Sequence, residues 1–125
     1  MEKALRYELE QAIPELAGNI YPTNAPEAAE KPYLVYYRQN TDHVKTLEGY
    51  TDKQGLTYLY SVMAAKYGDM KILRDKIEAF LLALPGQDIG EDGIHIEDVD
   101  INNINETYEF NLRMNRGIID FTVFF

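Results

Sequence analysis

The chain has 125 residues, of which 46% are hydrophobic, and its 21 acidic and 12 basic residues give a net charge of -9. A chain of this length and composition supports one hydrophobic core, so we expect residues 1–125 to form a single domain. A protein this acidic does not hold a nucleic-acid backbone by general electrostatics, and the absence of cysteine excludes disulfides, thiolate metal sites and a thiol nucleophile.

The first 16 residues predict an amphipathic helix. Its apolar residues follow the spacing of one helical face: Leu5, Leu9, Ala12, Ile13 and Leu16. Pro14 lacks an N–H group, so we expect the helix to end or kink near Ala12 and Gly18 to close the segment. Charged residues alternate with apolar ones here, unlike a signal peptide, and no apolar run of the chain approaches the ~20 residues that span a bilayer. We therefore expect no membrane association.

The middle of the chain predicts strands. Residues 21–31 contain two prolines and form an irregular connection, whereas residues 33–37 form a short strand of aromatic and β-branched residues. Residues 43–48 can continue as a strand, with residues 49–54 as its loop. Residues 56–67 lack an interior glycine or proline, and neither alternating face is strongly polar, which is typical of a strand covered on both sides. A helix is the competing interpretation of this segment.

Residues 69–84 predict a second helix. One apolar stripe runs along it: Met70, Leu73, Ile77, Phe80, Leu81 and Leu84. Asp69 can cap the first turn, and Pro85 with Gly86 ends the helix.

The last part of the chain predicts antiparallel strands. Residues 87–93 form an acidic loop with glycines, and the apolar residues that follow change parity once, which a β-bulge at Glu97 and Asp98 would correct. Residues 108–114 alternate as a half-buried strand, and residues 119–125 return as the last strand. We expect the turn between them at 115–117, with Gly117 at positive φ.

The order of elements favours an α+β fold. A helix and three strands are followed by a second helix and three more strands. We expect a mainly antiparallel sheet of about five or six strands, with the two helices packed on one face.

Catalytic residues find little support in the sequence. Ser61 is the only serine, and no glycine-flanked turn surrounds it. His43 lies in a polar segment and His95 on the polar face of a strand, as ordinary exposed histidines do. We predict a protein that is not an enzyme and that holds no cofactor.

One stretch of the chain is strongly acidic. Between residues 86 and 109 there are eight carboxylates and no lysine or arginine: Asp88, Glu91, Asp92, Glu97, Asp98, Asp100, Glu106 and Glu109. A calcium-binding EF-hand loop needs a glutamate at its twelfth position, where Val99 stands, and a helix after it. We therefore predict no metal site here, and interpret the stretch as a solvated surface or as an interaction surface that repels another polyanion.

The linear order of the chain resembles the tail completion, or tail-to-head joining, proteins of long-tailed phages, which are similar to tail terminators. A short first helix is followed by Ile20-Tyr21-Pro22, Ala25-Pro26, Pro32-Tyr33-Leu34-Val35-Tyr36, Leu47-Glu48-Gly49, a long strand entering the second helix, Arg113 and Asp120-Phe121-Thr122-Val123. The likeness covers nearly the whole chain. The sequence departs from the family in having Tyr67 near the end of the long strand, where the family often has a tryptophan, and in its acidic stretch.

The resemblance implies a structural phage or prophage protein without catalysis. Such proteins cap the tail tube, usually as a hexameric ring, and dock it to the connector beneath the head. The implied partners are the major tail protein, the head-connector (stopper) protein and further copies of the chain, with DNA passing by without specific binding. The implied location is the tail–head interface of the virion, after assembly in the bacterial host cytoplasm.

Two surfaces become candidates for these contacts. The polar hairpin would touch an adjacent subunit or the tail tube through His43, Lys45, Leu47 and Tyr50, because an exposed tyrosine favours protein contacts. Acidic residues would face the lumen or its rim, where carboxylates repel DNA phosphates: Glu91, Asp92, Glu97, Asp98 and Asp100.

A different class of function fits the charge equally well. An acidic inhibitor or immunity-type protein would bind a basic partner such as a nuclease, with steered and strongly salt-dependent association.

Overall fold

The computed structural model describes residues 1–23, 25, 32–46 and 49–125, and for 39–46 and 49–53 it describes the backbone alone. In chain order the elements are α1 (Glu2–Ala12), the 3₁₀ helix η1 (Pro14–Leu16), β1 (Ile20–Pro22), β2 (Tyr33–Thr46), β3 (Gly49–Ala64), α2 (Tyr67–Leu82), β4 (Asp88–Ile89), β5 (Ile94–His95), β6 (Asp98–Glu109) and β7 (Met114–Phe124).

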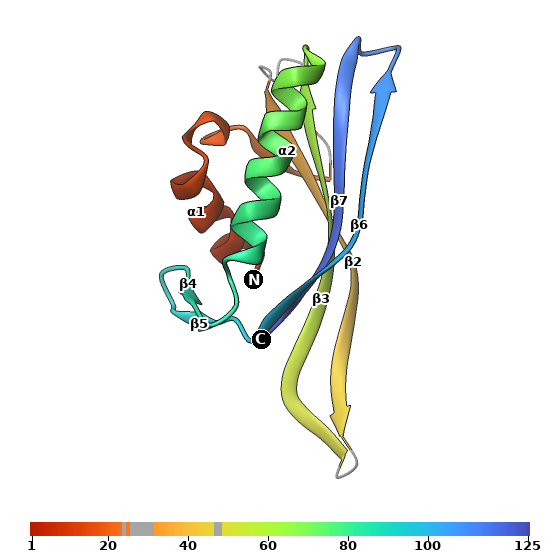
Figure 1. The fold of residues 1–125 in the computed structure, drawn as a ribbon. Coiled ribbons are helices and arrows are strands. Elements are labelled where there is room, and N and C mark those ends of the chain that lie inside the picture. Colours follow the sequence, from red (N-terminus) through yellow and green to blue (C-terminus); the bar gives the residue numbers. More distant parts are fainter. Residues whose placement is uncertain (24, 26–31, 47–48) are drawn as a thin grey trace.

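Five of the strands form one twisted sheet with both helices on the same face (Figure 1). The strand order is β1-β2-β3-β7-β6, and all neighbours are antiparallel except β1 and β2. Strands β4 and β5 form a separate small hairpin. The predicted α+β class, with a mainly antiparallel sheet and two helices on one face, is confirmed.

The helices follow the predicted pattern closely. Helix α1 ends at Ala12, and Pro14 opens η1. Gly18 then adopts a φ of 78°, which a glycine reaches without strain. Helix α2 begins at Tyr67, and the predicted cap was wrong: Lys66 stands at the N-cap position without a side-chain bond, and Asp69 lies inside the first turn.

The core lies between the helices and the facing side of β3 and β7. Phe121 at its centre is fully buried. Its ring stacks on Tyr58 at 5.7 Å between centroids and meets Tyr60 edge-on at 4.8 Å. Leu5, Leu9 and other apolar side chains of the helices close this layer, so most of both predicted stripes is buried against the sheet. The exceptions are Ala12, which is exposed, and Phe80, which is half-buried.

The aromatic core predicts sensitivity to alkali. Burial raises the pKa of both Tyr58 and Tyr60 well above the usual range of a tyrosine, and the Glu2 carboxylate adds to the effect at Tyr58. The folded state therefore favours neutral tyrosines, and its advantage is complete below about pH 10 and is lost as the pH rises further. In a titration followed by tyrosinate absorbance, at least these two tyrosines should stay protonated above about pH 10 until the chain unfolds. Ionisation of all tyrosines in one step while circular dichroism still reports a folded chain would contradict this.

The predicted turn at 115–117 was wrong. Gly117 lies inside β7, where it pairs with Val62. A Cβ atom at this position would lie 2.8 Å from the sulfur of Met70, so glycine is needed because α2 packs directly on the strand. The turn lies four residues earlier, with Arg113 at a φ of 52°.

Residues 108–114 are therefore not a half-buried strand. Tyr108 is the penultimate residue of β6, and Phe110 and Leu112 stand on the turn, all three exposed. Only Met114, at the start of β7, is buried.

The bulge predicted at Glu97 and Asp98 was also wrong. Ile94 and His95 belong to the small β4–β5 hairpin, and the chain then crosses into the large sheet, where the backbone N–H of Glu97 donates to the Phe124 carbonyl at 2.8 Å. The apolar residues change parity because they serve two different sheets. The irregularity of β6 lies later, between Ile101 and Asn103.

Strands β2 and β3 are longer than predicted. The segment 49–54 is part of β3 and not a loop, and the backbone pairs His43 with Gln54 and Lys45 with Tyr50. Short β1, which pairs with β2, overlaps the start of the segment 21–31 that the sequence suggested was an irregular connection.

Candidate functional site

The possible catalytic side chains are used in structural contacts. Ser61 is buried, and its hydroxyl accepts hydrogen bonds from Nη2 of Arg116 at 2.8 Å and from Nε at 3.1 Å. His95 lies opposite Asp88 in the β4–β5 hairpin, with Nδ1 2.7 Å from the carboxylate, and both side chains are exposed. Within the described parts of the chain, no three His, Asp or Glu side chains form a group that could hold a metal ion. A search of the same residues finds no helix long and apolar enough to cross a membrane.

The first candidate surface is the ribbon formed by the ends of β2 and β3. Strand β7 pairs with β3 only from Gly55 onward, so residues 49–53 pair with β2 alone. The ribbon projects beyond the rest of the sheet (Figure 1). His43, Lys45 and Tyr50 lie on it by their backbone positions, whereas Leu47 lies outside the described residues. We call residues 39–46 and 49–53 the β2–β3 ribbon.

The second candidate surface is acidic. Glu91 and Asp92 lie in the turn between β4 and β5, Glu97 in the crossing to the large sheet, and Asp98 and Asp100 at the start of β6. All five side chains are exposed. The structure thus gathers all five predicted acidic residues around the β4–β5 hairpin and the beginning of β6, and we call them the acidic end.

The β4–β5 hairpin of the acidic end packs against α1. The backbone N–H of Gly90 donates to Oε1 of Glu8 at 3.1 Å. Gly90 has a φ of 74°, and a Cβ atom there would lie 2.7 Å from that of Ala4. A glycine is therefore required where the small hairpin touches the helix, and this contact positions Glu91 and Asp92.

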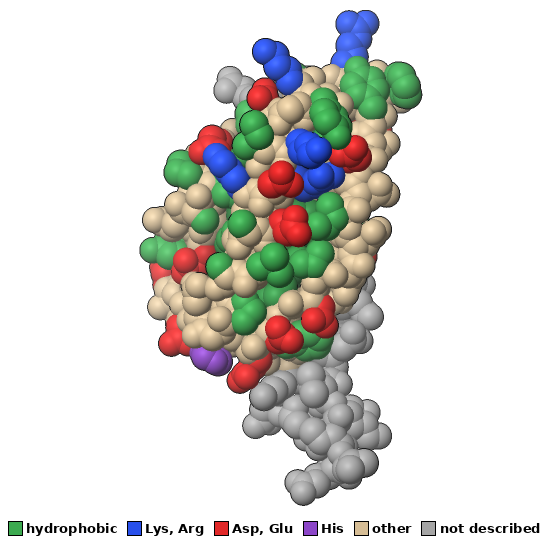
Figure 2. All heavy atoms as spheres, in the orientation of Figure 1, with side chains coloured by type: hydrophobic (Ala, Val, Ile, Leu, Met, Phe, Trp, Pro, Cys, Tyr) green, Lys and Arg blue, Asp and Glu red, His purple; other side chains and the backbone are tan. Residues whose placement is uncertain are grey.

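Basic side chains are unevenly distributed on the face of the molecule that Figure 2 shows. In Figure 2 the visible lysines and arginines lie in the upper half, whereas the lower half carries acidic side chains and a histidine. Part of this pattern follows from the sequence, because no lysine or arginine occurs between Lys76 and Arg113, although Lys3 of α1 lies beside Glu91 and Asp92. The β2–β3 ribbon projects from the same lower part of the fold.

Ion pairs hold the upper part of the layers together. Arg74 of α2 lies 3.1 Å from Glu106 of β6, and the hydroxyl of Tyr67 donates to the same carboxylate at 2.9 Å, which raises the pKa of Tyr67. Lys76 donates to Glu15 of η1 at 2.9 Å, and this hydrogen bond lowers the pKa of Glu15. Both pairs tie the middle of α2 to its neighbours.

A third surface was missed by the sequence argument: the apolar tip of the β6–β7 hairpin. Phe110 is 82% exposed and Leu112 is 53% exposed. Tyr108 packs edge-on against Phe110, with centroids 5.0 Å apart. The strict alternation of apolar and polar residues imitated a buried strand, and only Asn111 offered a turn signal. We call Tyr108, Phe110, Leu112 and Arg113 the hairpin tip.

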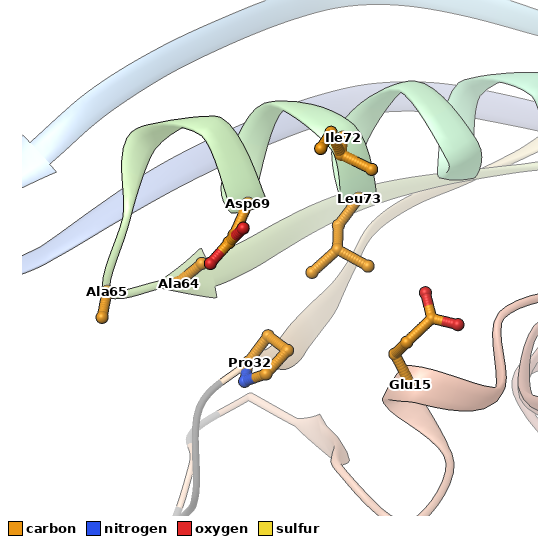
Figure 3. Close-up of a pocket in the computed structure, with 7 residues that line it drawn as sticks. All are labelled: Glu15, Pro32, Ala64, Ala65, Asp69, Ile72 and Leu73. Carbon is orange, nitrogen blue, oxygen red and sulfur yellow. The ribbon is translucent and has the colours of Figure 1, made fainter.

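A groove lies between the first half of α2 and η1, with a volume of about 360 Å³. Leu73 and Asp69 point from α2 toward Pro32, and Glu15 points from η1 toward α2 (Figure 3). Ile72 and the end of β3 complete the lining. Because the lining comes from four separate segments, no sequence motif marks this groove.

Comparisons with known proteins relate the chain to others by fold. No family model matches the sequence, and no curated protein matches it. Among solved structures, a chain of the "virion of native gene transfer agent (GTA) particle" matches with a TM-score of 0.62 and 16% sequence identity, over 96% of this chain and 92% of that one. At this identity the match establishes a shared fold.

Proposed function

We propose that this chain is a structural protein of a phage or phage-like virion that completes the tail tube and joins it to the head connector as a ring, without catalysis. The observation that carries the proposal is the shared fold with a chain of a gene transfer agent virion, which extends over 96% of this chain. Two proteins that share a structural role are expected to match in fold over nearly the full length of both chains, as these two do. The order of the sequence motifs supports the same class of protein.

The β2–β3 ribbon supports a role in assembly. An isolated two-stranded hairpin is marginally stable in water, so a ribbon that leaves its sheet gains stability from a neighbouring chain. We propose that it contacts an adjacent subunit or the tail tube through His43, Lys45, Leu47 and Tyr50. A ring needs two different surfaces on each copy, and a projecting ribbon can add a further contact to the neighbour or to the tube.

The acidic end supports passage of DNA. We propose that Glu91, Asp92, Glu97, Asp98 and Asp100 face the lumen or its rim, where carboxylates repel phosphates and prevent the DNA from adhering. Every copy in the ring would contribute the same charges, so the effect would be multiplied by symmetry.

The joining role is tested by removing the chain from its particle. A nonsense mutation in the gene should leave filled heads and separate tails in electron micrographs, and the purified chain added to such an extract should restore joined particles. Joined, infectious particles in the absence of the chain would refute the proposal. The rival function, an acidic inhibitor, would instead be supported by a stable complex with a basic protein that weakens steeply with salt.

Charge reversal at the acidic end tests the lumen proposal. Changing Glu91→Lys and Asp92→Lys should slow DNA ejection by about tenfold, because lysines in the lumen attract the phosphates. The control changes Asp75→Lys and Glu78→Lys on α2, which alters the net charge equally. Ejection measured by release of DNA from purified particles should slow only in the first variant, and equal rates in both would contradict the lumen placement.

A further inference from the structure

We infer that the hairpin tip of one copy inserts into the α2–η1 groove of the next copy, and that this contact closes the ring. The inference rests on the proposed ring function and names the two surfaces that meet. It is carried by the exposure of the tip, the lining of the groove, the charges on both, and their places in the fold.

The tip has the properties of an anchor. Phe110 is 82% exposed and is held against Tyr108 at 5.0 Å, so an apolar pair projects in a defined orientation. Aromatic side chains that insert into pockets dominate the energetics of protein contacts. The hydroxyl of Tyr67, the first residue of α2, donates to the Glu106 carboxylate. The residues that follow Glu106 in β6 therefore extend beyond the start of the helix, and α2 does not cover the hairpin tip.

The groove has the complementary properties. Its lining includes Pro32, Ile72 and Leu73, and Ile72 is 56% exposed. Its volume of about 360 Å³ is of the size that receives an anchoring side chain group. Apolar surface is thus exposed on both sides, and burying each against the other removes both from water.

Charge also matches across the contact. Arg113 stands on the tip, exposed, and Asp69 and Glu15 project into the groove. Glu15 is engaged by Lys76, whereas Asp69 has no hydrogen-bond or ion-pair partner among the described residues. When Phe110 inserts into the groove, the Arg113 guanidinium can form an ion pair with the Asp69 carboxylate.

The positions of the two surfaces suit a ring. In Figure 1 the β6–β7 tip stands at the upper end of the molecule, and the groove lies at the same end, beside the base of the hairpin, because Asn115 of β7 donates a hydrogen bond from Nδ2 to the carbonyl of Ala65 in the groove lining at 3.2 Å. Contacts between two different surfaces at the same end repeat from copy to copy and can close into a ring. The edge of β6 itself is a poor alternative, because it carries Asp98, Asp100 and an irregularity after Ile101, and such features prevent strand pairing between molecules.

Cysteine pairing tests the contact, since the chain contains no cysteine of its own. A variant with Phe110→Cys and Ile72→Cys should, after oxidation of assembled particles, give a ladder of linked chains on a denaturing gel. Each single variant should give dimers at most, and a control pair of Phe110→Cys with Glu91→Cys, at the opposite end of the fold, should give no ladder. Particles that are joined and contain the chain but yield no ladder, or in which the Phe110→Cys thiol links to a different protein, would overturn the inference while leaving the joining function intact.

A charge exchange gives an independent test that does not remove the apolar anchor. Changing Arg113→Asp should reduce joined particles at least about tenfold, because like charges then meet in the groove. Aspartate tolerates the positive φ of this position, so the turn is retained. Adding Asp69→Arg should restore joining, whereas adding Asp75→Arg, on the same helix outside the groove, should not. Failure of Asp69→Arg to restore joining better than Asp75→Arg would contradict the contact.

Discussion

Replacement of Phe121 by alanine should lower the free energy of unfolding by about 3–5 kcal/mol, the range for removing a large aromatic side chain from a packed core. Phe121 is fully buried and contacts both Tyr58 and Tyr60, so its loss leaves a cavity and removes two ring contacts at once. Urea unfolding followed by circular dichroism measures the change.

The matched control is the same substitution at the hairpin tip. Phe110 is 82% exposed, and Phe110→Ala should change the free energy of unfolding of the monomer by less than about 0.5 kcal/mol. A loss below about 1 kcal/mol for Phe121→Ala, or equal losses for the two variants, would contradict the position of the core.

Shortening the β2–β3 ribbon should abolish joining and leave the fold intact. The change replaces residues 44–53 by Asn-Gly, a two-residue turn that connects His43 to its partner Gln54. Gln54 keeps its two backbone hydrogen bonds with Phe125, at 2.9 and 3.0 Å, so the edge of the core is undisturbed. We expect the melting temperature to remain within a few degrees, and the restoration of joined particles in the mutant extract to fall by at least about tenfold, because interface anchors concentrate binding energy.

A variant of full length separates the role of the ribbon from that of its side chains. Lys45→Ala with Tyr50→Ala keeps the strand pairing but removes two of the proposed contacts. A loss of joining in both variants would assign the contact to these side chains, and a loss in the shortened chain alone would assign it to the ribbon backbone. Normal joining by the shortened chain would refute the role of the ribbon.

The sequence predicted the features that depend on local periodicity. The stripe containing Leu73 and Ile77 identified α2, and the alternation of Ile119, Phe121 and Val123 identified the buried face of β7. Pro14 marked the end of α1 because a proline excludes a helical hydrogen bond wherever it stands. The acidic residues were also found from the sequence, since a run without cations stays acidic in any fold.

Errors arose where the pattern did not reveal which layer covers a segment. The alternation around Phe110 looked like a half-buried strand, but α2 begins at Tyr67, and the tip lies beyond it. Gly117 looked like a turn glycine, but the approach of Met70 requires it inside a strand.

The sequence by itself determined the α+β class, the two helices, the buried face of the last strand and the acidic character of the chain, because each follows from neighbours along the chain. Only the tertiary structure decided that the hairpin tip is exposed to solvent, that the β2–β3 ribbon projects beyond the sheet, and that four separate segments form a groove. These features depend on how far the helices extend over the sheet and how far each strand extends beyond its neighbours. Packing between residues far apart in the chain sets both.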